Sequence, residues 1–340
     1  MKTLVTGGTG FVGSHLIEHL HTGGDQVRAL VRPGSNADFA RSLGADVVTG
    51  DLDDRDSLDA ACAGCDVVYH AAAKVEIVGR EDDFQRTTVG GTERLVEAAR
   101  TAGIRRFVYV SSCGIYHPRL LSSGRVIDES TPTPEPPRWF RYGRAKFRAE
   151  NVVRRGVRPP GEWVIVRLGY LYGPRNRTMK TYLDVLFRNN IMMIIGDGCN
   201  EMALIDVGDA VRAIALAGRC PDAAGKVLIA SGDERVTQRQ YFDALADGFG
   251  VPRIKRSIPY RVAYLFGWLG EYIAVGPRRS LVRRSAVVLT GLPQRLRCDN
   301  TRRLLGWKPQ VRFADGIRRA FDWYRSEYND AGLPALTENR

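Results

Sequence analysis

The stretch KTLVTGGTGFVGSHL, residues 2–16, decides the fold of this chain. A short apolar run leads directly into three glycines, Gly7, Gly10 and Gly13, and then into a helical pattern. The first glycine permits a tight turn, the second lets backbone amides approach a pyrophosphate, and the third allows close helix–strand packing. The N-terminus of the following helix adds partial positive charge at the same place. The stretch therefore predicts a turn that binds a dinucleotide.

Strand-like and helix-like segments alternate beyond this turn. The expected strands cover residues 2–7, 26–32, 46–51, 66–73, 105–112 and 162–169, with a further strand returning at 226–231. The expected helices between them cover residues 14–23, 37–44, 57–64, 88–103 and 145–156. Apolar runs without alternation are typical of strands buried on both faces of a parallel sheet. We therefore predict an α/β protein with a doubly wound, parallel Rossmann sheet.

The pattern loosens after the segment GPRN at 173–176, where helical runs such as 181–189 and 239–250 dominate. We predict a dinucleotide-binding domain over residues 1–172 with a return segment at about 201–230. The remaining parts, 173–200 and 231–328, are expected to form a smaller, mostly helical substrate lobe, followed by a tail at 329–340.

Composition favours an ordinary globular protein. The chain has 340 residues, of which 44% are hydrophobic and 26% charged. We see no secretory leader and no apolar run of the ~20 residues that a membrane span needs, so a cytoplasmic location is expected. The net charge of +12 comes from widely spread arginines without a nucleic-acid-binding motif, so no nucleic acid partner is expected. The pair Cys62 and Cys65 lacks further ligands, which favours packing over a metal site.

The choice of cofactor depends on the residue after the second strand. This place commonly holds a carboxylate that binds the ribose of NAD, but here it holds Arg32. A guanidinium suits the 2′-phosphate of NADP, and Arg28 and Ser35 could assist, with an Arg28 side chain that points to solvent as the alternative. We predict NADP, with NAD as the alternative. Asp51 and Leu52, after the third strand, are expected to face the adenine.

A candidate catalytic pair, Tyr142 and Lys146, lies four residues apart on a predicted helix, so both side chains share one face. An ammonium beside a phenol is expected to lower the pKa of the phenol and make proton exchange easier. Ser112 ends the preceding strand, at the sheet edge where ligands of open α/β sheets bind. A solvent-exposed Tyr–Lys face without function is the alternative.

Taken together, the segments TGGTGFVG, GDL, HAAA, VYVSSCGIY, YGRAK, VRLGYLYGP, IGDG and LGWKP resemble the extended short-chain dehydrogenase/reductase family. The resemblance implies that Ser112 is the catalytic Ser/Thr, Tyr142 the general acid/base and Lys146 its partner. It also implies a substrate cavity near Arg167–Gly173, and commonly a homodimer. The cofactor-binding residues predicted from the motifs and the resemblance are Gly7, Gly10, Phe11, Val12, Gly13, Arg32, Asp51, Leu52, Ala71, Ala72, Ala73, Tyr142, Lys146 and Leu168. The predicted substrate-pocket residues are Cys113, Tyr116 and Tyr170.

Two departures bear on the branch of the family. Nucleotide-sugar enzymes commonly carry an arginine shortly after GDG, whereas this chain has Glu201, Met202 and Ala203. A carboxylate and two apolar side chains suit a diphosphate poorly. Thr88 replaces the usual Asn before V-x-G-T, which puts in doubt any role of that amide. The chain resembles instead the 3β-hydroxysteroid dehydrogenase-like and dihydroflavonol-reductase-like branches.

The segment 258–275 is unusually aromatic and could line a pocket for a hydrophobic substrate. For most of its aromatic residues we expect a place in the core of the lobe. A face resting on a membrane is a further alternative, because basic residues flank the segment. The aromatic residues are Tyr260, Tyr264, Phe266, Trp268 and Tyr272, and the basic ones are Lys255, Arg256, Arg278, Arg279, Arg283 and Arg284.

The leading expectation is an NADP(H)-dependent oxidoreductase that interconverts a ketone and a secondary alcohol on an apolar small molecule. Hydride transfer would be coupled to acid/base catalysis by the tyrosine. The alternative is a nucleotide-sugar 4-epimerase or dehydratase with tightly bound NAD. A binding or redox-sensing protein without turnover is a third hypothesis, which the intact Ser/Tyr/Lys set disfavours.

Overall fold

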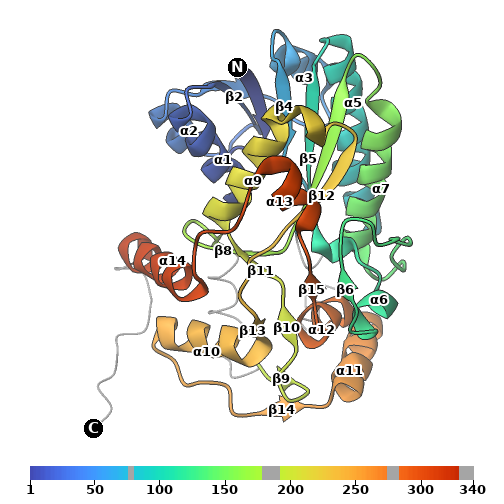
Figure 1. The fold of residues 1–340 in the computed structure, drawn as a ribbon, viewed down its shortest axis with the longest axis vertical. Coiled ribbons are helices and arrows are strands. Elements are labelled where there is room, and N and C mark those ends of the chain that lie inside the picture. The colour runs from blue at the N-terminus through green and yellow to red at the C-terminus, as the bar shows by residue number, and fades with distance from the viewer. Residues whose placement is uncertain (76–79, 178–191, 274–282, 329–340) are drawn as a thin grey trace.

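A seven-stranded parallel sheet forms the centre of the protein in a computed structural model that describes residues 1–75, 80–177, 192–273 and 283–328 (Figure 1). Its strand order is β12-β7-β5-β4-β1-β2-β3. The strands are β1 (Lys2–Thr6), β2 (Gln26–Val31), β3 (Asp46–Thr49), β4 (Val67–His70), β5 (Arg106–Ser112), β7 (Glu162–Leu168) and β12 (Lys226–Ala230). All seven lie where the apolar runs predicted strands, and the doubly wound parallel sheet is confirmed.

Helices cover both faces of the sheet. On one face α1 (Phe11–Thr22) packs against α9 (Val207–Arg219), with α2 (Asp38–Ser42) beside α1. On the other face α5 (Gly91–Thr101) packs between α3 (Arg55–Cys62) and α7 (Arg141–Gly156). Each layer has its own apolar core against the sheet. Because strands such as β5 are buried almost along their whole length, the sheet holds its carboxyl ends in fixed positions.

Most of the remaining elements lie below the carboxyl edge of the sheet and form a lobe (Figure 1). Four two-stranded pairings build it: β6 (Val126–Ile127) with β15 (Arg295–Leu296), β8 (Tyr170–Tyr172) with β11 (Leu204–Asp206), β9 (Ile194–Ile195) with β14 (Ser257–Ile258), and β10 (Glu201–Met202) with β13 (Val236–Thr237). Its longer helices are α10 (Gln238–Phe249), α11 (Tyr260–Ile273), α12 (Arg284–Gly291) and α14 (Phe313–Tyr328). Shorter helical segments are α4 (Glu81–Phe84), η1 (Gln85–Gly90), η2 (Cys113–Ile115), α6 (Pro118–Ser122), η4 (Pro221–Ala223) and α13 (Asp299–Leu305).

Two segments cross the predicted domain boundaries. In the predicted first domain, β6 pairs with β15 of the lobe. In the predicted lobe, α13 packs on β12 and α9, and Trp307 donates its indole N–H to the carbonyl oxygen of Asp209 at 3.0 Å. The division into 1–172 with 201–230, and 173–200 with 231–328, stays a prediction. The expected helix at 181–189 and the tail at 329–340 lie outside the described residues.

The aromatic segment differs in part from the expected lobe core. Tyr260 and Tyr264 are half-buried, but Phe266 is 56% exposed and Trp268 is 39% exposed. The expectation of a core position is wrong for these two, because α11 buries only the opposite side against α12. The side chain of Tyr272 lies outside what the structure describes.

The cysteine pair packs as the sequence predicted. Cys62 and Cys65 are buried in the core beneath α3, and burial raises the pKa of the Cys62 thiol to about 12. Within the described ranges, no cluster of three or more His, Cys, Asp or Glu side chains could hold a metal ion. Over the same ranges, no helix combines the length and apolar character needed to cross a bilayer.

Candidate active site at the carboxyl edge of the sheet

The glycine turn after β1 has the geometry of a phosphate cradle. Gly7 has a φ of +71°, which favours glycine, and its carbonyl oxygen accepts a hydrogen bond from the Gly10 amide at 2.9 Å. A Cβ atom on Gly13 would come within 2.0 Å of the Gly7 oxygen, so α1 can approach the turn only with glycine there. Gly10 is the N-cap of α1 and brings no side chain to occupy the first amides. These amides fit a pyrophosphate, and the half-buried Phe11 and Val12 open the helix beside them.

Arg32 lies directly after β2, and its exposed side chain makes no hydrogen bond or ion pair with any residue that the structure describes. It therefore fits a 2′-phosphate at this edge. Arg28 does not: its Nε donates to the Asp46 carboxylate at 2.7 Å and its Nη1 to the Ala63 carbonyl at 2.9 Å. The expectation that Arg28 assists is wrong, because its side chain ties β2 to β3 and to the end of α3. Ser35 is half-buried, and its amide donates to the Arg32 carbonyl.

The ends of β3 and β4 lie at the same edge. Leu52 is 7% exposed and packs against Gly91, where an added Cβ would meet it at 2.9 Å. The Asp51 carboxylate accepts a hydrogen bond from the Asp53 amide at 3.0 Å. Ala71, Ala72 and Ala73 continue from β4 and are half-buried, and the glycine turn runs against Ala72. These predicted cofactor residues thus follow strands at the carboxyl edge of the sheet, with Ala71 and Ala72 directly beside the glycine turn.

The side chain of His70, at the end of β4, connects β1 with α5. Its Nδ1 lies 2.7 Å from Thr6 Oγ1 and its Nε2 lies 3.0 Å from Thr92 Oγ1, so both ring nitrogens are satisfied. Burial, with a contribution from the Lys146 charge, lowers the pKa of His70 to about 3. Thr88, at the position of the missing Asn, is buried in η1 and accepts a hydrogen bond from the Lys74 amide at 3.2 Å. Thr88 thus ties η1 to the segment that follows β4.

The three predicted catalytic side chains come together where β5 meets α7. Ser112 is the last residue of β5, and its Oγ accepts a hydrogen bond from the Gly114 amide at 3.0 Å. A Cβ on Gly114 would lie 3.3 Å from Ser112 Oγ and 3.4 Å from Tyr142 Cε1, so only glycine fits comfortably between them. Lys146 lies one turn further along α7 and is 3% exposed, whereas Tyr142 is half-buried.

The electrostatics of the pair differ from the expectation. Burial raises the pKa of Tyr142 to about 12, and a hydrogen bond from Ser112 opposes this shift. Burial lowers the pKa of Lys146 to about 7, and the Glu150 charge opposes that shift. The prediction that Lys146 lowers the phenol pKa is not met, because its Nζ donates to the Val110 carbonyl at 2.7 Å and lies over the Tyr109 ring.

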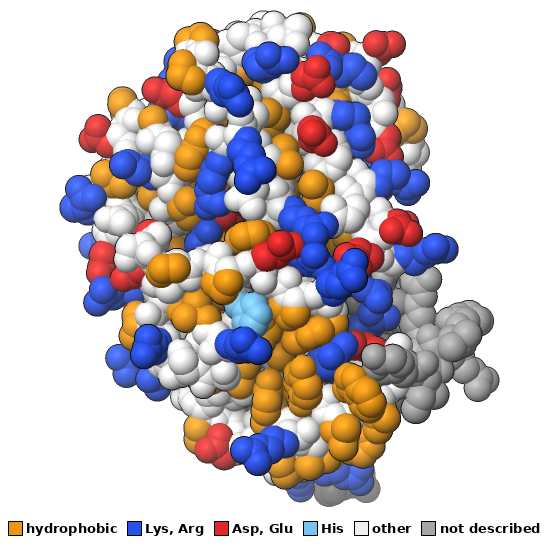
Figure 2. All heavy atoms as spheres, turned by 90° about the vertical axis from the view of Figure 1, so that its right-hand side faces the viewer, with side chains coloured by type: hydrophobic (Ala, Val, Ile, Leu, Met, Phe, Trp, Pro, Cys, Tyr) orange, Lys and Arg blue, Asp and Glu red, His pale blue; other side chains and the backbone are white. Residues whose placement is uncertain are grey.

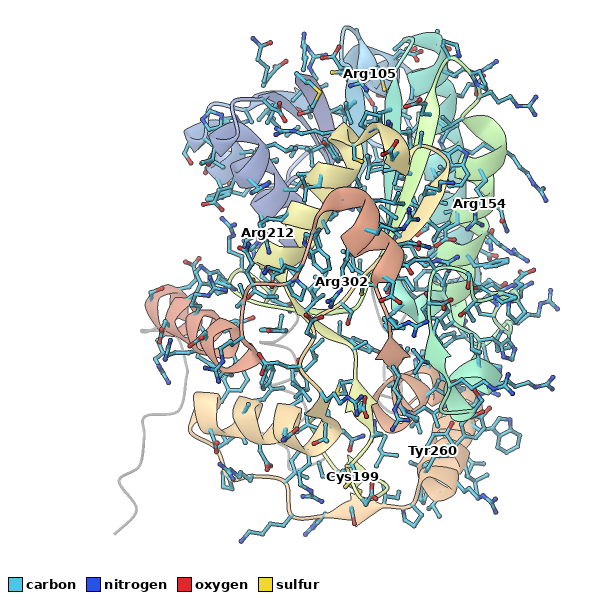
Figure 3. The ribbon with its side chains drawn as sticks, in the orientation of Figure 1. Arg105, Arg154, Cys199, Arg212, Tyr260 and Arg302 are labelled. Atoms are coloured by element: carbon cyan, nitrogen blue, oxygen red, sulfur yellow. The ribbon has the colours of Figure 1, made fainter. Side chains whose placement is uncertain are left out.

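A buried carboxylate beneath the pair was missed at the sequence level. Glu150 is fully buried one turn beyond Lys146. Its oxygens accept hydrogen bonds from Ser111 Oγ at 2.7 Å, Arg167 Nε at 3.0 Å and Arg154 Nη2 at 2.9 Å (Arg154 is labelled in Figure 3). Its spacing of four from Lys146 on the inner face of an amphipathic helix was the available signal.

The predicted pocket residues divide into two groups. Tyr170 is half-buried, donates to the Leu289 carbonyl at 3.1 Å and accepts from Gln294 Nε2 at 3.2 Å. Cys113 is buried with its Sγ 3.8 Å from Gln294 Oε1, and burial raises its thiol pKa to about 12. Gln294, in the segment after α12, therefore contacts both Tyr170 and Cys113.

Tyr116 and Leu168 lie in the core. Tyr116 is fully buried with the Arg167 guanidinium 5.5 Å from its ring centroid, so it does not line an open cavity. Leu168 is 2% exposed and belongs to the same apolar cluster. Arg167 itself points to α7 and the Glu150 carboxylate rather than to a cavity mouth. The spacing of these residues predicted the right strand ends but not the direction of their side chains.

The residues after GDG have no free cation for a diphosphate. Glu201 forms an ion pair with Arg295 at 3.2 Å. Met202 is 5% exposed and pairs with Val236 across β10 and β13.

Similarity to known proteins decides the family. A profile of the NAD dependent epimerase/dehydratase family matches residues 3–230. The chain belongs to this family. It is an extended short-chain dehydrogenase/reductase type of NAD(P)-dependent enzyme, as the motifs implied.

Relatives in the epimerase/dehydratase family cover nearly the whole chain. A 4-hydroxy-2-methyl-3-oxo-4-farnesyl-3,4-dihydroquinoline-1-oxide ketoreductase of Stigmatella aurantiaca is 32% identical over 93% of this chain and 95% of its own. A 2-alkyl-3-oxoalkanoate reductase of Stenotrophomonas maltophilia is 30% identical over 94% and 98%. In structure, a double mutant of the dTDP-glucose 4,6-dehydratase DesIV of Streptomyces venezuelae, with NAD bound, has a TM-score of 0.72 at 26% identity, covering 97% and 98%. The family therefore includes both ketoreductases and nucleotide-sugar enzymes.

Proposed function

We propose that this enzyme is an NADP(H)-dependent oxidoreductase that interconverts a ketone and a secondary alcohol on an apolar small molecule. The observation that carries the proposal is the meeting of Ser112, Tyr142 and Lys146 at the carboxyl edge of β5, on the side of the sheet where the glycine turn lies. A proton donor, an oxygen-binding hydroxyl and a buried amine are what the reduction of a carbonyl requires.

In the reducing direction, the nicotinamide of the bound cofactor would supply the hydride that adds to the carbonyl carbon. The Tyr142 hydroxyl donates its proton to the carbonyl oxygen, and Ser112 Oγ donates a hydrogen bond that holds this oxygen in place. Because burial raises the pKa of Tyr142 to about 12, the phenol is protonated at neutral pH and carries the proton that the reduction consumes. Lys146, one turn along α7 with its buried Nζ donating to the Val110 carbonyl, would hold the ribose hydroxyls of the bound cofactor.

Two features support NADP over NAD. The place after β2 has Arg32 instead of a carboxylate, and that guanidinium is exposed and unpaired among the described residues. A 2′-phosphate would supply the missing partner through charge-assisted hydrogen bonds.

An apolar substrate is supported by the lobe and by the relatives. The ion pair of Glu201 with Arg295 leaves a poor environment for a diphosphate. The Stigmatella relative is named for a farnesylated ketone, and the Stenotrophomonas relative for an alkylated oxoalkanoate. Both names combine a keto group with a hydrocarbon substituent, farnesyl in one and alkyl in the other.

The alternative function is a nucleotide-sugar 4-epimerase or dehydratase, and the likeness to the NAD-containing dehydratase DesIV favours it. The two functions differ in what happens to the cofactor. A reductase oxidises one NADPH per turnover, whereas an epimerase regenerates its bound NAD within each turnover.

The test is a screen of hydrophobic ketones and alcohols against nucleotide sugars, followed by nicotinamide absorbance. Stoichiometric loss of NADPH with a ketone supports the proposal. Turnover of a nucleotide sugar without net absorbance change, together with NAD in the purified protein, would establish the alternative.

The variant Tyr142→Phe should lower kcat by roughly 10²–10⁴-fold, the usual contribution of a general acid. Tyr241→Phe is the matched control, because it removes a phenol hydroxyl from α10, in a separate core cluster. An unchanged rate in Tyr142→Phe would disprove the catalytic assignment.

The cytoplasmic location and the homodimer stay predictions.

A further inference from the structure

Four large apolar side chains of α11 are exposed. Val262 is 41%, Leu265 53%, Phe266 56% and Trp268 39% exposed, and we refer to these four as the α11 face. Val262, Leu265 and Phe266 follow the i, i+3, i+4 spacing that places side chains on one side of a helix. Exposed large apolar residues that gather in this way mark an interaction site rather than random surface composition.

The opposite side of α11 is firmly packed, so the α11 face has a fixed direction. Ala263 is 4% exposed, and the Tyr264 ring meets Trp139 edge-on with centroids 6.0 Å apart. Gly267 lies so close to α12 that an added Cβ would be 2.7 Å from the Arg284 amide nitrogen. Rotating the helix to bury the α11 face would break these contacts.

Up to residue 270, the sequence that leads into and forms α11 carries only positive charge. Residues 248–270 contain four Lys or Arg and no Asp or Glu. Three of these cations, Lys255, Arg256 and Arg261, are exposed and form no ion pair with a residue that the structure describes. The next acid, Glu271, is bound to Arg284, whose Nε donates at 2.8 Å. Figure 2 shows the apolar side chains gathered at the lower part of the molecule with basic side chains beside them.

We propose that the α11 face docks on the surface of an anionic phospholipid bilayer. An apolar helix face bordered by cations matches the acyl boundary and the charged headgroups at once. With 14 residues, α11 is about 21 Å long, shorter than the ~30 Å hydrocarbon core, so it lies in the interface and does not span. A second copy of the chain fits less well, since two such faces would bring like charges together.

The location of α11 connects the surface to the site, and this step rests on the proposed function. Trp139, which contacts Tyr264, lies two residues before the start of α7, the helix that carries Tyr142 and Lys146. A membrane-docked α11 would therefore hold the active-site lobe at the interface where apolar ketones partition.

The test is cosedimentation of the full chain with phosphatidylcholine vesicles, with and without phosphatidylserine, in the absence of substrate and cofactor. We expect binding to the anionic vesicles that weakens with salt. Each exposed cation contributes about fivefold to partitioning, so Lys255→Gln/Arg256→Gln/Arg261→Gln should reduce binding by about 100-fold. Leu265→Glu/Phe266→Glu should abolish it. The control Phe39→Glu alters an aromatic that is 39% exposed on α2, far from α11 in Figure 1, and should bind normally.

Circular dichroism and a thermal melt of each variant exclude misfolding as the cause of lost binding. Equal binding by wild type and by Leu265→Glu/Phe266→Glu would overturn the proposal. So would a wild-type dimer that ignores vesicles and becomes monomeric in that variant, because the face would then be a contact between copies. Since vesicle binding needs no turnover, its failure is separate from failure of the proposed reaction.

Discussion

The substitution Glu150→Gln tests how the buried network supports α7, the helix that carries Tyr142 and Lys146. It keeps the size of the side chain and removes its charge. Glu150 is fully buried, and its main partner Arg167 is 4% exposed. The substitution therefore leaves the Arg167 guanidinium in the core without a counter-charge. Removing one partner of a buried ion pair costs about 3–5 kcal/mol.

The expected change in melting temperature follows from the size of the chain. With an unfolding entropy of about 2.1 cal/mol/K per residue, a 340-residue protein loses about 4–7 °C for that cost. Arg154→Gln is the matched control. Arg154 bonds the same carboxylate but is 29% exposed, and Arg167 still neutralises Glu150 without it, so we expect a change of about 1 °C.

The pH dependence of the rate gives a second readout. Burial lowers the pKa of Lys146 to about 7, and the Glu150 charge limits this shift. Activity that requires charged Lys146 is complete below this pKa and is lost as the pH rises through it. Without the Glu150 charge the pKa falls further, so this limb of the profile should move to lower pH. Glu150→Asp, which keeps the charge, should return this limb of the pH profile to its wild-type position.

The same shift affects stability with a defined sign. The pKa of Lys146 is about 7 in the folded protein, below its ordinary value of 10.5. Between these values the unfolded chain binds more protons, so this contribution to stability rises with pH across that window. The measurements are thermal melts and kcat/KM over a pH series with a ketone substrate. If Glu150→Gln melted like wild type and kept its pH profile, the reasoning on the network would be refuted.

Two further predictions concern the cofactor. Arg32→Ala should weaken the binding of NADPH by about 10–100-fold and leave the binding of NADH unchanged, since hydrogen bonds to charged groups contribute about 1.5–3 kcal/mol. Fluorescence titration measures both affinities. Arg41→Ala, which removes a nearby exposed charge paired with Asp38, is the control, and equal loss for both cofactors would argue against a 2′-phosphate site. Gly13→Ala should abolish binding of both cofactors while circular dichroism shows a folded protein, because its Cβ would displace the Gly7 carbonyl. Retained affinity in that variant would contradict the cradle.

The sequence predicted the seven strands because fully apolar runs have few alternatives to a buried parallel sheet. It predicted the Ser112, Tyr142 and Lys146 cluster because strand ends and helix starts share one edge. It did not predict side-chain direction. Arg28 and Arg32 sit four residues apart around β2, yet the first binds Asp46 and the second is free among the described residues.

The sequence also did not predict the pKa shifts of the candidate catalytic residues. The spacing of Tyr142 and Lys146 suggested mutual influence, but burial dominates both pKa values and the Val110 carbonyl takes the lysine N–H. The aromatic sequence of α11 likewise predicted a helix in the core of the lobe, because the sequence does not show which side of the helix packs against α12.

The segment that carries α13 closes over the last strand of the central sheet. Thr301 Oγ1 accepts from the Ile229 amide and donates to its carbonyl, and the Gln310 and Val311 amides bond the buried Asp209 carboxylate. A chain stopped at residue 230, where the family match ends, would lack the hydrogen-bond partners that residues 301–311 supply to β12 and α9. We therefore expect the nucleotide-binding half to be less stable when it is produced alone than within the full chain.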